Sequence, residues 1–177
     1  MGNQLKNCSV AKNIRQQLTL FPDKKDAREI EAIREKFNIQ QARLIKSHVT
    51  LCREDEISDI DKIFDNIATF NPEAITLEFE QAIRFDNGKG VLIPALHDDA
   101  FHGLREMVLK GTNTTIRRHQ PHITLMHPRN STCTDDIFET IKKVNLPTHL
   151  MFKSISLIEQ IDGGDWETLK TFHLKVV

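Results

Sequence analysis

Two short stretches of the chain, His48-Val49-Thr50-Leu51 and His122-Ile123-Thr124-Leu125, share the pattern His-x-Thr-Leu and decide how the rest of the sequence is interpreted. They are offset by 74 residues (122 minus 48). Around each copy, the apolar residues switch between a period near 3.6 and a period near 2, which is typical of helices that alternate with short strands. The sequence therefore predicts two similar halves with one copy of the pattern in each.

Each half has the same predicted order: a strand, a helix, the His-x-Thr-Leu strand, a second helix and a final strand. In the first half these are the strand 18–22, a helix with the apolar stripe Ala27, Ile30, Ile33 and Phe37, the strand 44–52, a helix capped by Ser58 with the stripe Ile60, Phe64 and Ile67, and the strand 74–85. In the second half they are the strand 91–94, a helix with Phe101, Leu104 and Val108, the strand 122–125, a helix with Ile137, Ile141 and Val144, and the strand 150–158.

These elements predict a single domain. We place the two repeats at about residues 17–87 and 88–160, followed by a C-terminal strand at 166–177. The mixed order of helices and strands with short connections favours an α+β fold with antiparallel sheets over a doubly wound parallel sheet.

The charge of the chain limits its partners. The sequence has 24 Lys and Arg against 25 Asp and Glu, so it lacks the basic excess that holds long double-stranded nucleic acid. The longest stretch without a charged residue, His119 to Pro128, has ten residues, whereas a membrane-spanning helix needs about 20 apolar residues. We therefore expect neither a long-duplex binder nor a membrane protein.

The N-terminal stretch and the cysteines indicate a cytoplasmic protein. Met1 to Ala11 lacks the apolar core of a secretory signal, and Lys6 stands where an N-myristoylation motif has Ser or Thr. The three cysteines, Cys8, Cys52 and Cys133, are widely spaced, which predicts reduced thiols and no thiolate zinc site. We expect a cytoplasmic protein that is a monomer.

The spacing of His and Thr places both side chains on one face of each predicted strand. Residues two apart on a strand point to the same side, with Cα atoms roughly 6.5–7 Å apart. The residue between them, Val49 or Ile123, then points into the opposite layer. If the two halves pack about an approximate two-fold axis, two imidazoles and two hydroxyls face one another across a cleft. The duplicated pattern thus predicts a two-histidine site.

Two facing imidazoles suit phosphoryl transfer. One neutral imidazole can accept a proton near neutral pH while a protonated partner donates one. In-line attack on phosphorus needs both transfers, and the hydroxyls of Thr50 and Thr124 could donate to the non-bridging oxygens. We therefore assign His48 and His122 as the acid–base pair, and we expect no metal and no other cofactor.

A structural role for these residues is the alternative. A single His in an apolar strand is usually packed or hydrogen-bonded, and Thr is common in strands. Two copies of a four-residue pattern at matching positions of two similar halves are improbable by chance, so the duplication favours a functional site.

The duplicated pattern and its surroundings resemble the two-histidine phosphoesterase superfamily, and within it the bacterial 2'-5' RNA ligase-like branch. The resemblance rests on both His-x-Thr-hydrophobic motifs, the second preceded by Pro121, and on the stretches Gln17-Leu18-Thr19-Leu20-Phe21, Arg43-Leu44-Ile45 and His48 to Glu56. One departure is visible: Lys46-Ser47 precedes His48, where related sequences often have a Pro. This difference affects the approach to the first motif and not its catalytic residues.

The resemblance implies a bilobal α+β fold, with antiparallel sheets lining a central cleft on a pseudo-two-fold axis and helices packed outside. In such a fold both chain termini lie in one lobe, so the sequence halves need not equal the lobes. It also implies an enzyme that acts on RNA ends, which opens 2',3'-cyclic phosphates and cleaves or forms 2'-5' linkages. A module from another class, which binds a nucleotide or RNA end without turning it over, is the alternative, and a metal-free turnover assay separates the two.

Three further cations follow the motifs and are candidates to bind a substrate phosphate: Arg53, His127 and Arg129. By the period of two, His127 starts on the face opposite His122 unless the strand ends first, so exposure to solvent is an equal alternative for it.

Other residues have weaker functional interpretations. Arg117 and Arg118 precede the second motif and could follow an RNA backbone, although a solvated loop is the more common arrangement. Trp166 and Phe85 could stack on a base, although core packing is more common. A metal site at His119 and His122 is disfavoured, because Pro121 argues against a helix there and no carboxylate lies nearby in sequence.

Overall fold

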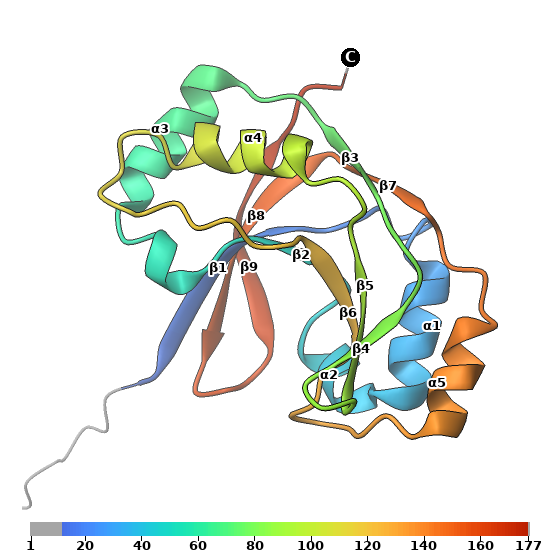
Figure 1. Ribbon diagram of the computed structural model, residues 1–177. Coiled ribbons are helices and arrows are strands. Elements are labelled where there is room, and N and C mark those ends of the chain that lie inside the picture. Colours follow the sequence, from blue (N-terminus) through green and yellow to red (C-terminus); the bar gives the residue numbers. More distant parts are fainter. Residues whose placement is uncertain (1–11, 177) are drawn as a thin grey trace, which may run out of the picture.

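The structure is a computed structural model that describes residues 12–176 (Figure 1). Its helices are α1 (Arg28–Phe37), α2 (Ile39–Leu44), the short 3-10 helix η1 (Glu54–Glu56), α3 (Ile60–Phe70), α4 (Asp99–Val108) and α5 (Asp135–Lys142). Its strands are β1 (Ile14–Leu20), β2 (Val49–Cys52), β3 (Ile75–Glu78), β4 (Ile83–Phe85), β5 (Gly90–Pro94), β6 (His122–Met126), β7 (His149–Phe152), β8 (Ser154–Ile161) and β9 (Trp166–His173). None of the helices in this part of the chain is long and apolar enough to cross a membrane.

The strands form three sheets in which every pair of named neighbours is antiparallel. One sheet has the order β2-β1-β8-β9, a second has the order β4-β5-β6, and β3 pairs with β7. The α+β class with antiparallel sheets is therefore confirmed.

The helices pack on the sheets in a crossed manner. Helix α4 contacts β2 and α3, whereas α1 contacts β6, and Figure 1 shows α5 beside α1. A helix from the first half of the sequence thus covers the sheet that carries the second motif, and a helix from the second half covers the sheet that carries the first. The apolar faces of α1 and α4 contribute to the core, in which Ile30 of α1 and Phe101 of α4 are fully buried.

The two motif strands pair with their neighbours in the same way. Thr50 lies opposite Thr19 on β1, and Thr124 lies opposite Leu92 on β5. In both pairs the register shifts immediately after the threonine, which is the mark of a β-bulge. The two motifs therefore share a backbone arrangement as well as a sequence pattern.

Five predicted strands are wrong in extent. The strand predicted at 18–22 is β1, which spans Ile14–Leu20, and the C-terminal strand predicted at 166–177 is β9, which ends at His173. The stretch 74–85 is divided between β3 and β4, and the stretch 150–158 is divided at Lys153 between β7 and β8. In both cases the two pieces belong to different sheets. Period-two alternation shows that a segment is extended but does not show which strand it pairs with, so a change of sheet is invisible to it. The predicted strand 44–52 begins only at Val49, because Leu44 ends α2.

The start of α3 also differs by one residue from the prediction. The residue that caps this helix is Asp59 and not Ser58: the Asp59 side chain accepts a hydrogen bond from the backbone N–H of Lys62 at 3.2 Å. Both residue types are good caps, and only the backbone geometry distinguishes them.

Gly103 in the middle of α4 offers a test of the packing. A Cβ atom built on it meets no atom within 4 Å, and its φ is not in the left-handed region. Gly103→Ala should therefore stabilise the fold by about 0.5–1 kcal/mol, because Gly is unfavourable in a helix. Thermal unfolding should show a rise in Tm of about 1–4 °C.

Gly90→Ala is the matched control for this prediction. At Gly90 a Cβ atom would lie 2.4 Å from Cε1 of Phe85, so the same substitution should destabilise the fold by about 1–3 kcal/mol. Equal effects of the two substitutions would contradict the packing described for α4 and β5.

Candidate active site

The two motif strands present their polar side chains on one face each, as the spacing predicts. His48, Thr50, His122 and Thr124 are half-buried. The intervening Val49 and Ile123, in contrast, are fully buried in the core. Strands β2 and β6 contact each other although they belong to different sheets (Figure 1). The two half-exposed His-Thr pairs therefore come from neighbouring strands.

Both histidine rings are held by the same kind of hydrogen bond. Nδ1 of His48 donates to the carbonyl oxygen of Lys46 at 2.7 Å, and Nδ1 of His122 donates to the carbonyl oxygen of Gln120 at 3.0 Å. In each case the acceptor lies two residues before the histidine. Because a carbonyl only accepts, Nδ1 carries the proton of each neutral ring and Nε2 keeps its lone pair. The protein thus orients two imidazoles in the same tautomer.

The two rings differ in their surroundings. Burial lowers the pKa of His48 to about 4, against the raising effect of the Lys46 carbonyl, and the nearby charges of Arg34 and His122 lower it further. His48 is therefore neutral at any pH well above 4. The influence of His122 on this pKa also indicates that the two rings are close enough to interact electrostatically.

A buried ion pair on α1 fixes the approach to His48. Arg34, which is 2 % exposed, donates to Glu31 at 3.0 Å and to the carbonyl oxygen of Ile45 at 2.8 Å. Glu31 in turn accepts from the backbone N–H of Ser47 at 2.6 Å. This contact gives a physical reason for the departure noted before the first motif, because a proline at position 47 has no N–H to donate. The second motif needs no such donor at Pro121.

A second buried pair fixes the segment after Thr50. Arg105 is 0 % exposed and Glu56 is 2 % exposed, and their side chains meet at 2.7 Å. Arg105 also donates to the carbonyl oxygens of Leu51 and Arg117, and Glu56 accepts from the backbone N–H of Arg53 at 2.9 Å. The pair thereby connects β2, η1 and the loop before β6.

The charge of this pair is maintained by the contacts between its members. Burial by itself would raise the pKa of the Glu56 carboxyl, but the hydrogen bonds from Arg105 and from the backbone of Arg53 hold the pKa below its ordinary value. The sequence contained a signal for this role, since Arg105 falls on the same helix face as Phe101, Leu104 and Val108 and must be buried with them.

A polar cavity adjoins the first motif. It has a volume of about 510 Å³ and is lined by Arg15, Gln17, Thr50, Arg53, Glu54 and Asp55. Thr50 therefore faces open space, with the predicted phosphate-binding residue Arg53 on the same cavity wall.

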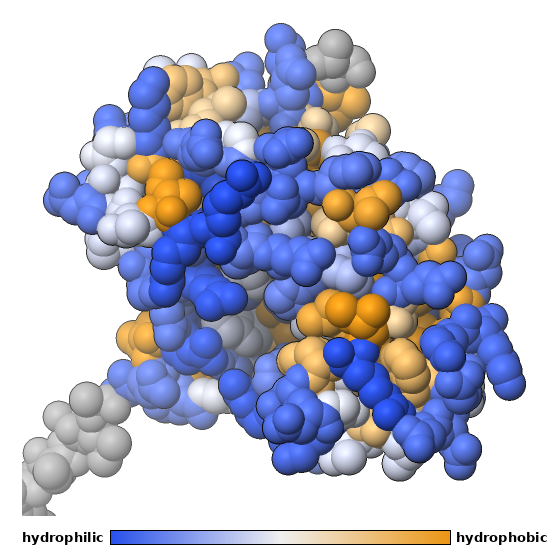
Figure 2. Space-filling model, in the orientation of Figure 1, coloured by the Kyte–Doolittle hydropathy of each residue, from blue (hydrophilic) through white to orange (hydrophobic). Residues whose placement is uncertain are grey.

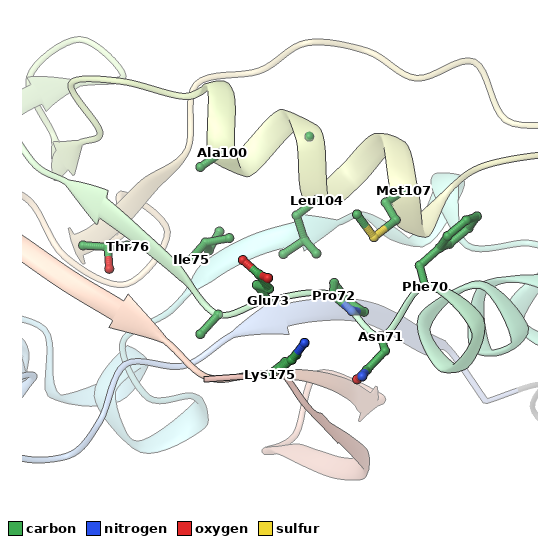
Figure 3. Close-up of a pocket in the computed structure, with 12 residues that line it drawn as sticks. Phe70, Asn71, Pro72, Glu73, Ile75, Thr76, Ala100, Leu104, Met107 and Lys175 are labelled. Carbon is green, nitrogen blue, oxygen red and sulfur yellow. The ribbon is translucent and has the colours of Figure 1, made fainter. Parts of the chain in front are cut away.

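A larger cavity of about 670 Å³ lies elsewhere (Figure 3). Figure 3 shows Ala100, Leu104 and Met107 of α4 along one side of it, and the segment from Phe70 to Thr76 together with Lys175 across from them. It contains no residue of either motif, so it does not belong to the candidate site.

His127 and Arg129 lie beyond the end of β6. The backbone N–H of His127 donates to Asn38 Oδ1 at 2.8 Å, and its ring Nδ1 accepts from the backbone N–H of Arg129 at 3.2 Å. Burial, followed by the charge of Arg129, lowers the pKa of His127. The hydrogen bonds and ion pairs formed by residues 12–176 do not connect either residue to the two motif imidazoles, and their part in substrate binding stays a prediction.

The aromatic candidates have intramolecular partners. The guanidinium of Arg15 lies 5.6 Å from the ring centroid of Trp166. Phe85 covers Gly90 so closely that a Cβ atom there would collide with its ring. Phe85 is therefore occupied by strand packing, whereas Trp166 is half-buried beside a cation.

The described residues contain no group of three or more His, Cys, Asp or Glu side chains arranged to hold a metal ion. His119 instead packs its ring against Phe101, with ring centroids 5.4 Å apart, and burial lowers its pKa.

Comparisons with known proteins agree with this description of the fold and its motifs. The family model described as the 2'-5' RNA ligase superfamily matches residues 21–164. Curated proteins give no match.

Solved structures show the same fold at low sequence identity. The structure of E. coli LigT in complex with 3'-AMP matches with a TM-score of 0.64 and 17% identity, over 91% of this chain and 98% of that one. A phosphoesterase structure matches with a TM-score of 0.61 and 15% identity, over 92% of this chain and 99% of that one. The apo form of E. coli LigT matches with a TM-score of 0.65 and 16% identity, over 94% and 99% of the two chains. Since the family model covers most of the chain and includes both His-x-Thr-Leu motifs, the chain belongs to the 2'-5' RNA ligase superfamily.

Proposed function

We propose that this protein is a metal-independent phosphoesterase that opens 2',3'-cyclic phosphates at RNA ends or on nucleotides. The observation that carries this proposal is the pair of imidazoles on neighbouring strands, each fixed in the same tautomer by a carbonyl two residues earlier. Two such rings supply a proton acceptor and a proton donor without a metal.

In the proposed hydrolysis His48 is the general base. Its pKa of about 4 keeps Nε2 unprotonated at neutral pH, so it can take a proton from the attacking water. A bond forms between the water oxygen and phosphorus while one ring P–O bond breaks. His122, in its protonated form, gives a proton to the departing ribose oxygen. The products are a phosphomonoester and a free hydroxyl. When a ribose 5'-hydroxyl attacks in place of water, the same two proton transfers form a 2'-5' linkage: a bond forms between the 5' oxygen and phosphorus while the bond from phosphorus to the 3' oxygen breaks, and that 3' oxygen receives the proton.

The threonines and the basic residues complete the proposed site. Thr50 and Thr124 share a face with their histidines and donate to the non-bridging oxygens, where negative charge builds up. Arg53, His127 and Arg129 are proposed to contact the phosphate or its neighbours.

The superfamily supports an activity on phosphoesters. The structurally similar E. coli LigT has been solved with 3'-AMP, ATP, NADP+ and phosphate, which is consistent with a nucleotide substrate for this chain too. The test is incubation with 2',3'-cyclic nucleotides and 2'-5' linked oligonucleotides in the presence of EDTA. We expect product from this panel; saturable binding without any product would favour the module that only binds.

The pKa of His48 predicts the acid side of the pH profile. Because the base must be neutral, kcat/KM for a 2',3'-cyclic nucleotide should fall only when the pH approaches about 4, and not near the ordinary histidine value. A profile measured from pH 3.5 to 9 checks this. An acid limb centred near pH 6.5 would contradict the assignment of His48 as the base.

The same group links stability to pH. Its pKa is about 4 in the folded chain and near 6.5 when unfolded, so the unfolded state binds more protons between these values. The stability contributed by neutral His48 is complete above about pH 6.5 and is lost as the pH falls towards 4.

A further inference from the structure

A second, smaller cavity adjoins the one beside Thr50. It has a volume of about 130 Å³ and is lined by Arg53, Glu56, Arg117, Arg118 and His119. Arg53 lines both cavities, so they lie next to each other between the first motif and the loop before β6, and together they are called the groove here. Figure 2 shows strongly hydrophilic side chains over η1 and over the segment between α4 and β6.

The charges in this groove are almost balanced, with one cation in excess. Its walls carry the four arginines Arg15, Arg53, Arg117 and Arg118 against the three carboxylates Glu54, Asp55 and Glu56. Buried Arg105 neutralises Glu56 from behind, and Arg15 pairs with Glu54 at 2.9 Å. Arg118 is held from the side by Asp98 at 3.2 Å. Arg53 forms no ion pair with any residue in 12–176, so the wall beside Thr50 presents a free guanidinium.

The ion pair between Arg117 and Asp55 is placed to exchange partners. Both side chains are more than half exposed, at 55% and 57%, and exposed pairs of this kind contribute only about 0–1 kcal/mol. The backbone of Arg117 is fixed, since its carbonyl accepts from Arg105 at 3.2 Å. A phosphate oxygen can therefore replace the Asp55 carboxylate without a movement of the loop, and it offers Arg117 the same charge-assisted hydrogen bonds.

We propose that this groove binds an additional phosphate of an RNA chain, so that the preferred substrate is the end of an oligonucleotide and not a mononucleotide. In this arrangement the scissile phosphate lies at the two histidines, and a neighbouring internucleotide phosphate is bound by Arg53 and Arg117. In the free protein the Asp55 carboxylate is paired with the Arg117 guanidinium, and the phosphate takes the place of this carboxylate on binding. This inference rests on the proposed function, since it defines the substrate class of the same site.

The size and charge of the groove fit a short single strand. The cavity of about 510 Å³ is within the roughly 300–1,000 Å³ of typical ligand pockets. The protein has a net charge of −1 and only one cation in excess in the groove, which suits a contact to a single phosphate and not to a long duplex.

The ion pair allows a test in which its two members have opposite effects. The substrates are a mononucleotide 2',3'-cyclic phosphate and a trinucleotide that ends in one. Arg117→Gln should lower kcat/KM for the trinucleotide about tenfold, because a charged phosphate contact is lost. Asp55→Asn should raise it several-fold, because the competing carboxylate is removed. Neither change should move the mononucleotide value more than twofold. Arg28→Gln, on the exposed start of α1, is the matched control and should change neither value.

The outcomes distinguish this inference from the proposed function. Equal wild-type values for the two substrates, with Arg117→Gln neutral, would overturn the groove but leave the phosphoesterase activity intact. A loss with both Arg117→Gln and Asp55→Asn would also overturn it, because the pair would then be structural. If neither substrate is turned over, the proposed function fails, and the phosphate site in the groove is then tested by binding of a fluorescent trinucleotide 3'-phosphate. A higher Kd with Arg117→Gln and a lower Kd with Asp55→Asn would support this site, and the absence of these two effects would overturn it.

Discussion

Replacing either His48 or His122 by Ala should lower the turnover of a 2',3'-cyclic nucleotide by about 10²–10⁴-fold, since positioned acid–base groups contribute about this much each. Each imidazole is oriented by its own carbonyl hydrogen bond, so each substitution removes one separately positioned Nε2. The double variant should lose less than the product of the two single losses, because the rings act as a unit. Initial rates with purified variants in EDTA measure these effects.

His173→Ala is the control for these variants. His173 is an exposed histidine at the end of β9, which is the edge strand of its sheet. It should retain the full rate. Unchanged far-UV circular dichroism of all variants would show that the losses are chemical. A single His variant that keeps more than a tenth of the wild-type rate would contradict the acid–base assignment of that residue.

Arg105→Met should destabilise the fold by about 3–5 kcal/mol, which is the usual cost of removing one member of a buried ion pair. The change leaves the Glu56 carboxylate, 2 % exposed, without its guanidinium, and it also removes the donors to the Leu51 and Arg117 carbonyls. Equilibrium unfolding in urea measures the loss. Glu56→Gln should destabilise in the same direction, and the double variant should cost less than the sum of the two single changes.

The exposed ion pair of Arg118 provides the comparison. Arg118 is 68% exposed in its pair with Asp98, so Arg118→Met should change the free energy of unfolding by at most about 1 kcal/mol. If Arg105→Met and Arg118→Met lowered the free energy of unfolding by similar amounts, the Glu56–Arg105 pair would not hold β2 and the loop before β6 together.

The face of each motif strand was predictable from the sequence because it depends only on local geometry. A separation of two residues places His48 and Thr50 on one side, whatever the strand pairs with. The burial of Val49 and the half-exposure of its two neighbours confirm this. The antiparallel α+β class was predictable for a similar reason, since it follows from the order of elements and their short connections.

The pairing of the strands and the partners of buried charges were not predictable, because they depend on tertiary contacts. Nothing in the alternation of residues 74–85 shows that the chain changes sheets between Glu78 and Ile83. Likewise, the helical pattern indicates that Arg105 is buried, but not that Glu56, 49 residues earlier, neutralises it. The same holds for Arg34, whose guanidinium reaches the carbonyl of Ile45 through the turn before His48.

The proposed chemistry is tested most directly by the rate of 2',3'-cyclic nucleotide hydrolysis in EDTA, compared between the wild-type protein and the His48→Ala/His122→Ala double variant. We expect sustained, metal-free turnover by the wild-type protein and a loss of at least 10²-fold in the double variant, with its fold intact. Equal rates for the two proteins, or a wild-type rate that appears only when a divalent metal is added, would contradict catalysis by the two histidines.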